Sequence, residues 1–412
     1  MAVPSIRRGT SFAVYGFVAL LFLPGLTAFV GCGGREGGQT NNASVVRTTV
    51  GEVPTLEQLE AFGVDFEKAV YSGNSVTIGR LFQGARTVDL ALSGIELPAG
   101  DSGGFRTGML EGLQAKGIQA QLGEVTRSGG DFRYMRVLDR TERPRVLFRI
   151  LGVDGSLNYL EAVVELNPAN QEVRAVDFYS YSTGELMTAT LRRETMRYLA
   201  ASESNTFLNR LTGTESDLVR ELPNIMKMYE AIGEGNGERA MEIYANLPAT
   251  LKKEKTILLA RFNAANLMGA ESGDFAEVEQ AVHDLRETFP KDPCLDLLEL
   301  DYYFVRNDMH GVMNSLDKLN EQVEGDPYLF NIKAGLLLDE GSGPGAIEVV
   351  REGLAQFPDD YDLLTQGLVV AAEQGERELF LKWYDAASAI EKPDPEFLGS
   401  LPNAATWLKD RK

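Results

Sequence analysis

The C-terminal half of the chain repeats with a step of 34 residues. Four columns of similar residues keep this step: Phe289, Val323 and Phe357; Asp292, Asp326 and Asp360; Leu295, Leu329 and Leu363; and Val282, Leu316 and Val350. Several columns at one period indicate a repeat architecture. From about residue 205 onward only the helical period is present. The sequence therefore predicts an all-α stack of helix pairs, in which each pair is buried against its neighbours.

The unit 327–360 resembles the tetratricopeptide repeat family. Small residues stand where the two helices of such a unit approach closely, large residues lie between them, and a Pro ends the unit; these residues are Ala334, Ala346 and Gly353, Phe330 and Leu337, and Pro358. Glu324 replaces the Pro one unit earlier, and units before Asp292 keep register only in their second helix, which predicts a short insertion near Gly269–Gly273. The resemblance covers about residues 205–395. It implies four to five helix pairs and a concave groove for a protein or peptide, with Trp407 in the tail 396–412 as a cap.

Residues 55–200 change period. Apolar residues recur at helical spacing after Thr55, which is placed as an N-cap with Gln58 completing a capping box. Period-two segments follow at Ile118–Thr126, Phe132–Asp139, Arg145–Leu151, Leu157–Leu166 and Val173–Tyr181. Helices followed by a meander of strands predict an α+β domain, with helices on one face of a curved antiparallel sheet.

This order of elements resembles the nuclear-transport-factor-2-like, cone-shaped family, whose members are small enzymes with a pocket or non-catalytic binding modules. On the last strand Asp177, Tyr179 and Tyr181 share one face, and Val176 and Phe178 lie on the other. Inside a cone, the Asp would serve as a base and a Tyr as an electrophile. The other interpretation is the wetter face of a half-exposed strand, and the domain has no His.

The only basic cluster lies on the predicted strands: Arg133, Arg136, Arg140, Arg143, Arg145 and Arg149. One interpretation is a face that receives an acidic partner, including the chain's own acidic repeats. The other is a solvated face with ordinary surface ion pairs.

Residues suited to nucleophilic or metal chemistry are few. The two His residues, His283 and His310, have no partner at the spacing of metal ligands. Cys294 has no His or second Cys beside it, and is predicted to be a small buried hydrophobe. The sequence predicts no cofactor and no metal.

The N-terminal segment has the pattern of a targeting signal. Arg7 and Arg8 precede an apolar stretch that ends at Gly31-Cys32. A small residue before a Cys, after apolar residues, resembles the lipobox of bacterial lipoproteins, although Phe29 stands where that family has Leu. The resemblance implies a signal peptide over 1–31, lipidation of Cys32, a flexible tether over 32–54 and anchoring in the bacterial cell envelope, facing the periplasm or the exterior. An uncleaved membrane anchor and ordinary signal cleavage are the alternatives.

The charge is distributed unevenly. The chain has a formal net charge of −20. Residues 55–200 hold 16 basic and 19 acidic groups, whereas residues 201–412 hold 20 and 39. This acidity excludes nucleic acid as the main partner and favours a basic protein segment. The sequence thus predicts a non-enzymatic, lipid-anchored scaffold. A small-molecule enzyme or binder in the cone, and a self-associating structural component, are the alternatives.

Overall fold

The computed structural model describes residues 53–95, 97, 102–140, 143–201 and 213–411. They form two compact units, 53–308 and 309–411. An α+β domain comes first, and every described element after it is a helix, as predicted. The boundary between the compact units lies within the predicted repeat region 205–395. The predicted signal peptide and all but the last two residues of the tether lie outside the described residues.

The first helix, α2 (Leu56–Tyr71), begins at the predicted capping box. Thr55 Oγ1 accepts from the Gln58 N–H at 3.3 Å, and Gln58 Oε1 accepts from the Thr55 N–H at 2.9 Å. Its apolar stripe is buried against the sheet. The helices that follow are α3 (Ser75–Leu81), α4 (Gly84–Ala91), α5 (Ser102–Lys116) and α6 (Ile118–Arg127).

The sheet is an antiparallel meander of five strands in chain order. They are β1 (Asp131–Leu138), β2 (Arg145–Leu151), β3 (Leu157–Leu166), β4 (Val173–Ser180) and β5 (Glu185–Leu186). Four of the five predicted strands are therefore confirmed. One face of the sheet packs on α2 through aromatic rings, since the Phe66 ring lies 6.0, 5.4 and 5.7 Å from those of Phe132, Phe148 and Phe178.

The prediction of a strand at Ile118–Thr126 is wrong, because this segment is helix α6. Leu122 and Val125 are buried at 0% and 4% exposure. Ile118, Leu122 and Val125 are spaced by four and three residues, which is the period of a helix. The alternation of Ile118, Ala120 and Leu122 also fits the period of a strand.

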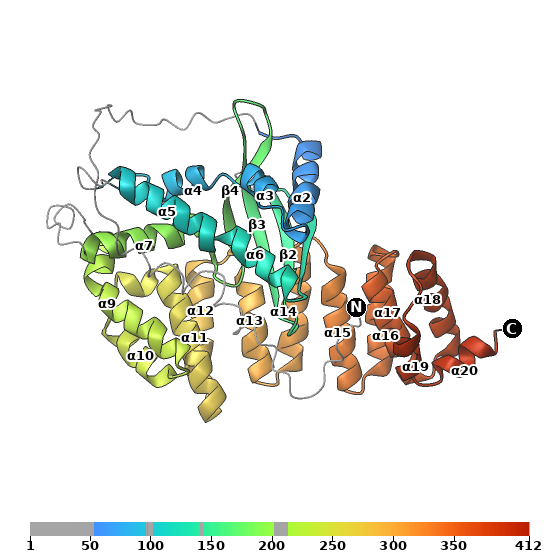
Figure 1. The fold of residues 1–412 in the computed structure, drawn as a ribbon. Coiled ribbons are helices and arrows are strands. Elements are labelled where there is room, and N and C mark those ends of the chain that lie inside the picture. The colour runs from blue at the N-terminus through green and yellow to red at the C-terminus, as the bar shows by residue number, and fades with distance from the viewer. Residues whose placement is uncertain (1–52, 96, 98–101, 141–142, 202–212, 412) are drawn as a thin grey trace. The chain divides into compact units, whose positions relative to one another are not determined.

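Helix α7 (Met187–Ala201) follows β5 directly, and the described part of the first unit then continues with α-helices and a short 3-10 helix, η2 (Leu251–Lys253). The α-helices are α9 (Gly213–Gly233), α10 (Gly237–Asn246), α11 (Lys255–Ser272), α12 (Ala276–Thr288) and α13 (Leu295–Val305). Successive helices pack in pairs, and Figure 1 shows α9–α13 side by side. Helix α11 has 18 residues and α13 has 11. The prediction of an insertion near Gly269–Gly273 is wrong, because the residues that follow α11, α13, α15 and α17 keep the 34-residue step with positive φ: Gly273, Asn307, Gly341 and Gly375. The extra residues lie at the start of α11.

The second unit, 309–411, continues the pairwise packing. Its helices are α14 (Met309–Gln322), α15 (Pro327–Asp339), α16 (Gly343–Gln356), α17 (Tyr361–Gln374), α18 (Arg377–Ile390), α19 (Pro395–Ser400) and α20 (Ala404–Lys409). The Trp407 ring packs edge-on against Phe380 with 5.3 Å between centroids, which is a contact that a C-terminal cap requires. Within the described part of the chain, every helix is too short or too polar to cross a lipid bilayer.

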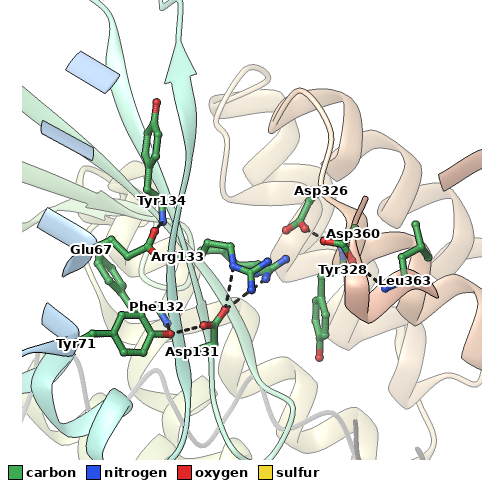
Figure 2. A network of polar contacts seen from close by, with 11 residues as sticks. Glu67, Tyr71, Asp131, Phe132, Arg133, Tyr134, Asp326, Tyr328, Asp360 and Leu363 are labelled. Atoms are coloured by element: carbon green, nitrogen blue, oxygen red, sulfur yellow. Dashed lines mark hydrogen bonds and ion pairs between the residues drawn. The ribbon is translucent and has the colours of Figure 1, made fainter. Parts of the chain in front are cut away.

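The Asp column of the 34-residue repeat has a physical cause. Asp326 and Asp360 are the N-caps of α15 and α17, and their carboxylates accept from the backbone N–H groups of Tyr328 at 2.9 Å and Leu363 at 2.8 Å. Figure 2 shows both caps. A carboxylate satisfies an otherwise unpaired N–H at the helix start. At these two positions the repeat therefore marks where the first helix begins, whereas the N-cap of α13 is Cys294 and Asp292 lies two residues before it.

Close helix approach gives a test. A Cβ on Gly353 would lie 2.9 Å from Phe330 Cγ and 2.7 Å from Leu363 Cδ2, whereas a Cβ on helical Gly399 would meet nothing within 4 Å. We expect Gly353→Ala to lower the free energy of unfolding by about 1–3 kcal/mol. Gly399→Ala should leave it unchanged or raise it by up to about 1 kcal/mol, because Ala favours helices. Urea denaturation of both variants would measure this, and equal effects would contradict close packing at Gly353.

Candidate functional site at the junction of sheet and helices

The second face of the sheet is polar and carries the three predicted candidates. Asp177 and Tyr181 are buried at 3% and 0% exposure, and Tyr179 is half-buried. A bulge between β3 and β4 changes the parity of β4. Ala175 and Phe178 both lie in the apolar cluster under α2, whereas Val176 is also 0% exposed but lies outside that cluster. The prediction that Val176 shares the face of Phe178 assumed strict alternation, which a bulge interrupts.

Tyr179 packs against α11 and α13 and does not line an open cone interior. Its ring packs with the apolar residues of α11 and α13, and its hydroxyl donates to Asp292. Lys255, at the start of α11, donates to the Tyr179 hydroxyl at 2.9 Å and also to Asp292 and to the carbonyl of Gly184. We call Tyr179, Gly184, Lys255 and Asp292 the junction cluster. It joins β4 and the turn after it to α11 and to the residues preceding α13.

The junction cluster holds its ionisable groups in fixed states. Burial of Asp292 alone would raise the pKa of its carboxyl. The Lys255 ammonium and the hydrogen bonds to Asp292 outweigh this effect and keep that pKa below its usual range. Burial, together with Cys294 and Asp292, raises the pKa of Tyr179. Burial also raises the pKa of the Cys294 thiol, whose side chain is 0% exposed. A thiol that stays protonated is a poor nucleophile, which agrees with the prediction of a small buried hydrophobe.

Asp177 and Tyr181 belong to separate hydrogen-bond groups. Asp177 accepts from the Thr188 hydroxyl, from the Thr188 N–H at 3.1 Å and from the Phe178 N–H at 2.8 Å. Burial nonetheless raises its pKa. The Tyr181 hydroxyl donates to Glu161 at 2.8 Å, and Arg140 donates to the same Glu161 oxygen at 2.5 Å. The three candidates thus lie on one face without converging on one point.

Three members of the Arg cluster, Arg133, Arg140 and Arg149, lie within ion-pair distance of a carboxylate, and they differ in exposure. Arg140 forms an ion pair with Glu161, and Arg149 lies 3.4 Å from Asp131. Figure 2 shows Asp131 also bound by Tyr71 and close to Arg133. The Arg149 side chain is only 2% exposed, so the interpretation as a solvated surface is wrong at this residue. The sequence pattern alone does not indicate that this face of the sheet is covered.

A cavity of about 90 Å³ lies beside the junction cluster. Its apolar lining comes from α9, α11 and α13: Leu222, Ile225, Met226, Leu259, Ala260 and Leu298. The segment 182–185 and α7 supply a polar wall, where Arg193 binds Glu185 through two contacts of 2.5 and 2.6 Å. Glu185 also accepts from Thr190 at 2.6 Å. Sequence reasoning missed this cavity because its walls come from segments up to 116 residues apart.

The remaining candidates lie at the surface or outside the described residues. His283 and His310 are exposed. The ligand atoms of His283, Asp284 and Glu287 lie within 4.8 Å of one another, but Asp284 already binds Arg261 and Gln280. Cys32, the predicted lipidation site, lies outside the described residues.

Comparison with known proteins gives no family. The chain matches no protein-family model and no curated protein sequence at a significant level. Its function is therefore argued from its residues and their geometry.

Gly184 provides a test of the junction. Its φ is +64°, and a Cβ there would lie 2.8 Å from Leu259 Cδ1 and 2.9 Å from Cys294 Sγ. Gly73 has φ +61° and nothing within 4 Å. We expect Gly73→Ala to cost about 1 kcal/mol of backbone strain and Gly184→Ala to cost about 1–3 kcal/mol more. Equal losses in urea denaturation would show that the junction is loosely packed.

Asp301 on α13 provides a pH test. Its side chain is buried at 6% exposure, its Oδ1 has no hydrogen-bond partner among the described residues, and burial raises its pKa well above the usual value. A raised folded-state pKa means that stability is lost as pH rises above the ordinary Asp pKa near 3.9. We expect Asp301→Asn to stabilise the protein by more than about 1 kcal/mol at pH 7 and by much less at pH 3.

The matched control for this test is Asp359→Asn, at an exposed position. It should leave the denaturation midpoint unchanged at both pH values. A destabilising Asp301→Asn at pH 7 would mean that the carboxylate has a partner when folded.

Proposed function

We propose that this protein is a non-enzymatic, lipid-anchored scaffold of the bacterial envelope, with acidic tetratricopeptide-like repeats that bind a basic segment of a partner protein. In this proposal Cys32 carries the lipid, residues 32–54 form the tether, and residues 55–200 are a nuclear-transport-factor-2-like module without catalytic activity. The proposal includes no cofactor and no nucleic-acid partner.

The observation that supports a scaffold best is the use of the reactive side chains. Lys255, Tyr179 and Asp292 bind one another across the junction of sheet and helices. Cys294 is buried beside them with a raised pKa. A catalytic group must reach substrate with a pKa matched to its task. These side chains instead hold the sheet against the helices, which favours a binding role over a catalytic one.

Charge on the repeats supports the basic partner. Residues 309–412 contain 9 basic and 19 acidic residues. Exposed acidic side chains occur on or beside α16, α17 and α18: Glu348, Glu352, Glu373, Glu376 and Glu378. A surface of one sign attracts the opposite sign and accelerates encounter, and salt weakens this effect.

The second candidate function is a small-molecule enzyme or binder that uses Asp177, Tyr179 or Tyr181. The raised pKa of the buried Asp177 carboxyl is the observation that favours it. Against it, the cavity of about 90 Å³ is lined by none of these three residues and is small beside ligand pockets of roughly 300–1,000 Å³.

The scaffold is tested by charge removal. Immobilised full-length protein would capture binding proteins from an envelope extract at low and high salt. We expect the triple substitution Glu352→Gln, Glu373→Gln and Glu376→Gln to lower recovery of basic partners several-fold at low salt and to reduce the salt dependence. The matched control changes three exposed glutamates of the first domain, Glu57, Glu60 and Glu111. Equal losses in both variants, or capture that salt does not weaken, would contradict the proposal.

The anchor is tested separately, by mass spectrometry of the mature N-terminus. We expect the first residue to be Cys32 carrying diacylglycerol, and Cys32→Ser to abolish both cleavage and membrane recovery after carbonate washing. An intact Met1, or a cleaved N-terminus without lipid, would exclude the lipoprotein assignment and leave the repeat proposal standing.

A further inference from the structure

One edge of the sheet is closed by side chains instead of by a strand. Strand β1 lies at this edge, and β2 pairs with one side of it only. The Phe132 N–H donates to the Tyr71 hydroxyl at 3.1 Å, and the Tyr134 N–H donates to Glu67 Oε2 at 2.6 Å. The Tyr71 hydroxyl in turn donates to Asp131, as Figure 2 shows. Both acceptors belong to α2, and they take the places where the backbone carbonyls of a sixth strand would bind.

The spacing of residues on α2 matches that on β1. Glu67 and Tyr71 are four residues apart, which is about 6 Å along a helix. Phe132 and Tyr134 are two residues apart, which is about 6.7 Å along a strand. Successive turns of α2 therefore bind alternate residues of β1. The close approach depends on Gly63, because a Cβ there would lie 2.8 Å from Tyr134 Cγ.

The edge formed by β4 is closed in a different way. Phe82 forms a parallel bridge with Ala175, whose carbonyl accepts from the Gln83 N–H at 2.8 Å. The Thr87 hydroxyl donates to the Val176 carbonyl at 2.7 Å, and β5 pairs with the end of β4. The β1 edge is held by side chains of a helix, which can rotate away from the strand.

We propose that Glu67 and Tyr71 form an edge guard, which prevents β1 from pairing with β1 of a second copy of this chain. An unpaired strand edge is a template for another chain, and a second copy presents the same two N–H groups. Because Phe132 and Tyr134 have the same parity, two copies can pair antiparallel about a twofold axis, with each Phe132 opposite the other copy's Tyr134. The edge guard uses no acidic residue of the 309–411 unit, so the inference goes beyond the function proposed above.

The test measures amide exchange of the full-length protein in detergent micelles, in dilute and in concentrated solution, by mass spectrometry that resolves β1. The open variant is Glu67→Ala with Tyr71→Ala. In dilute solution we expect its Phe132 and Tyr134 amides to exchange roughly two- to tenfold faster than in the unaltered protein, because each loses one hydrogen bond. In concentrated solution these amides should regain protection, and copies of this variant that carry different tags should co-purify.

Two controls separate edge pairing from general instability. Asp65→Ala with Lys68→Ala changes two exposed residues of the same helix, and Glu67→Gln keeps an acceptor oxygen in the edge guard. Both should exchange like the unaltered protein at both concentrations. If the open variant fails to fold, Glu67→Met with Tyr71→Phe decides by the same measurements, because it removes both acceptors and keeps the bulk of the side chains. Unchanged exchange in dilute solution, or fast exchange that concentration does not slow, would overturn the inference.

Discussion

The packing of the sheet against the helices in the first unit depends on the ion pair and hydrogen bonds of the Lys255 ammonium. Its acceptors are the carboxylate of Asp292, the hydroxyl of Tyr179 and the carbonyl of Gly184, which match the three N–H donors of an ammonium. One acceptor belongs to the strand, one to the turn after it and one to the helical region. A buried charge without its partners is costly. The geometry of this cluster therefore fixes how the sheet lies on α11 and α13.

This constraint explains why a polar face of a sheet is buried. Facing side chains of β3 and β4 are satisfied by short-range partners, as with Glu161 and Tyr181, or by the helices, as with Tyr179. The reactive groups on this face act in packing. A cavity of about 90 Å³ lies beside the cluster, and Thr183 and Asn263 are among the residues that line it.

Much of the fold could be predicted because its signals are local. The capping box at Thr55, the four confirmed strands and the Asp caps at 326 and 360 each depend on residues within a few positions of one another. The error at Ile118–Thr126 arose because nine residues fit both the strand and the helix period. The burial of Leu122 and Val125, which is spaced as in a helix, is visible only in the structure.

The junction could not be predicted, because residues 179, 184, 255 and 292 are distant in sequence and none has a local pattern. Tyr179 was predicted as part of a candidate catalytic face, and its structural partners lie 76 and 113 positions away. The bulge that separates Val176 from the cluster of Ala175 and Phe178 is likewise set by pairing between strands. Long-range contacts of this kind have no periodicity to detect.

The most direct measurement is hydrogen exchange on the Lys255→Met protein, with Lys253→Met as the control at an exposed neighbouring position. The account predicts that residues 179–186, the first turn of α11 and the start of α13 lose protection together, while Lys253→Met exchanges like the unaltered protein. Loss of protection confined to α11, with β4 and the turn after it unchanged, would contradict the claim that this ammonium holds the sheet on the helices.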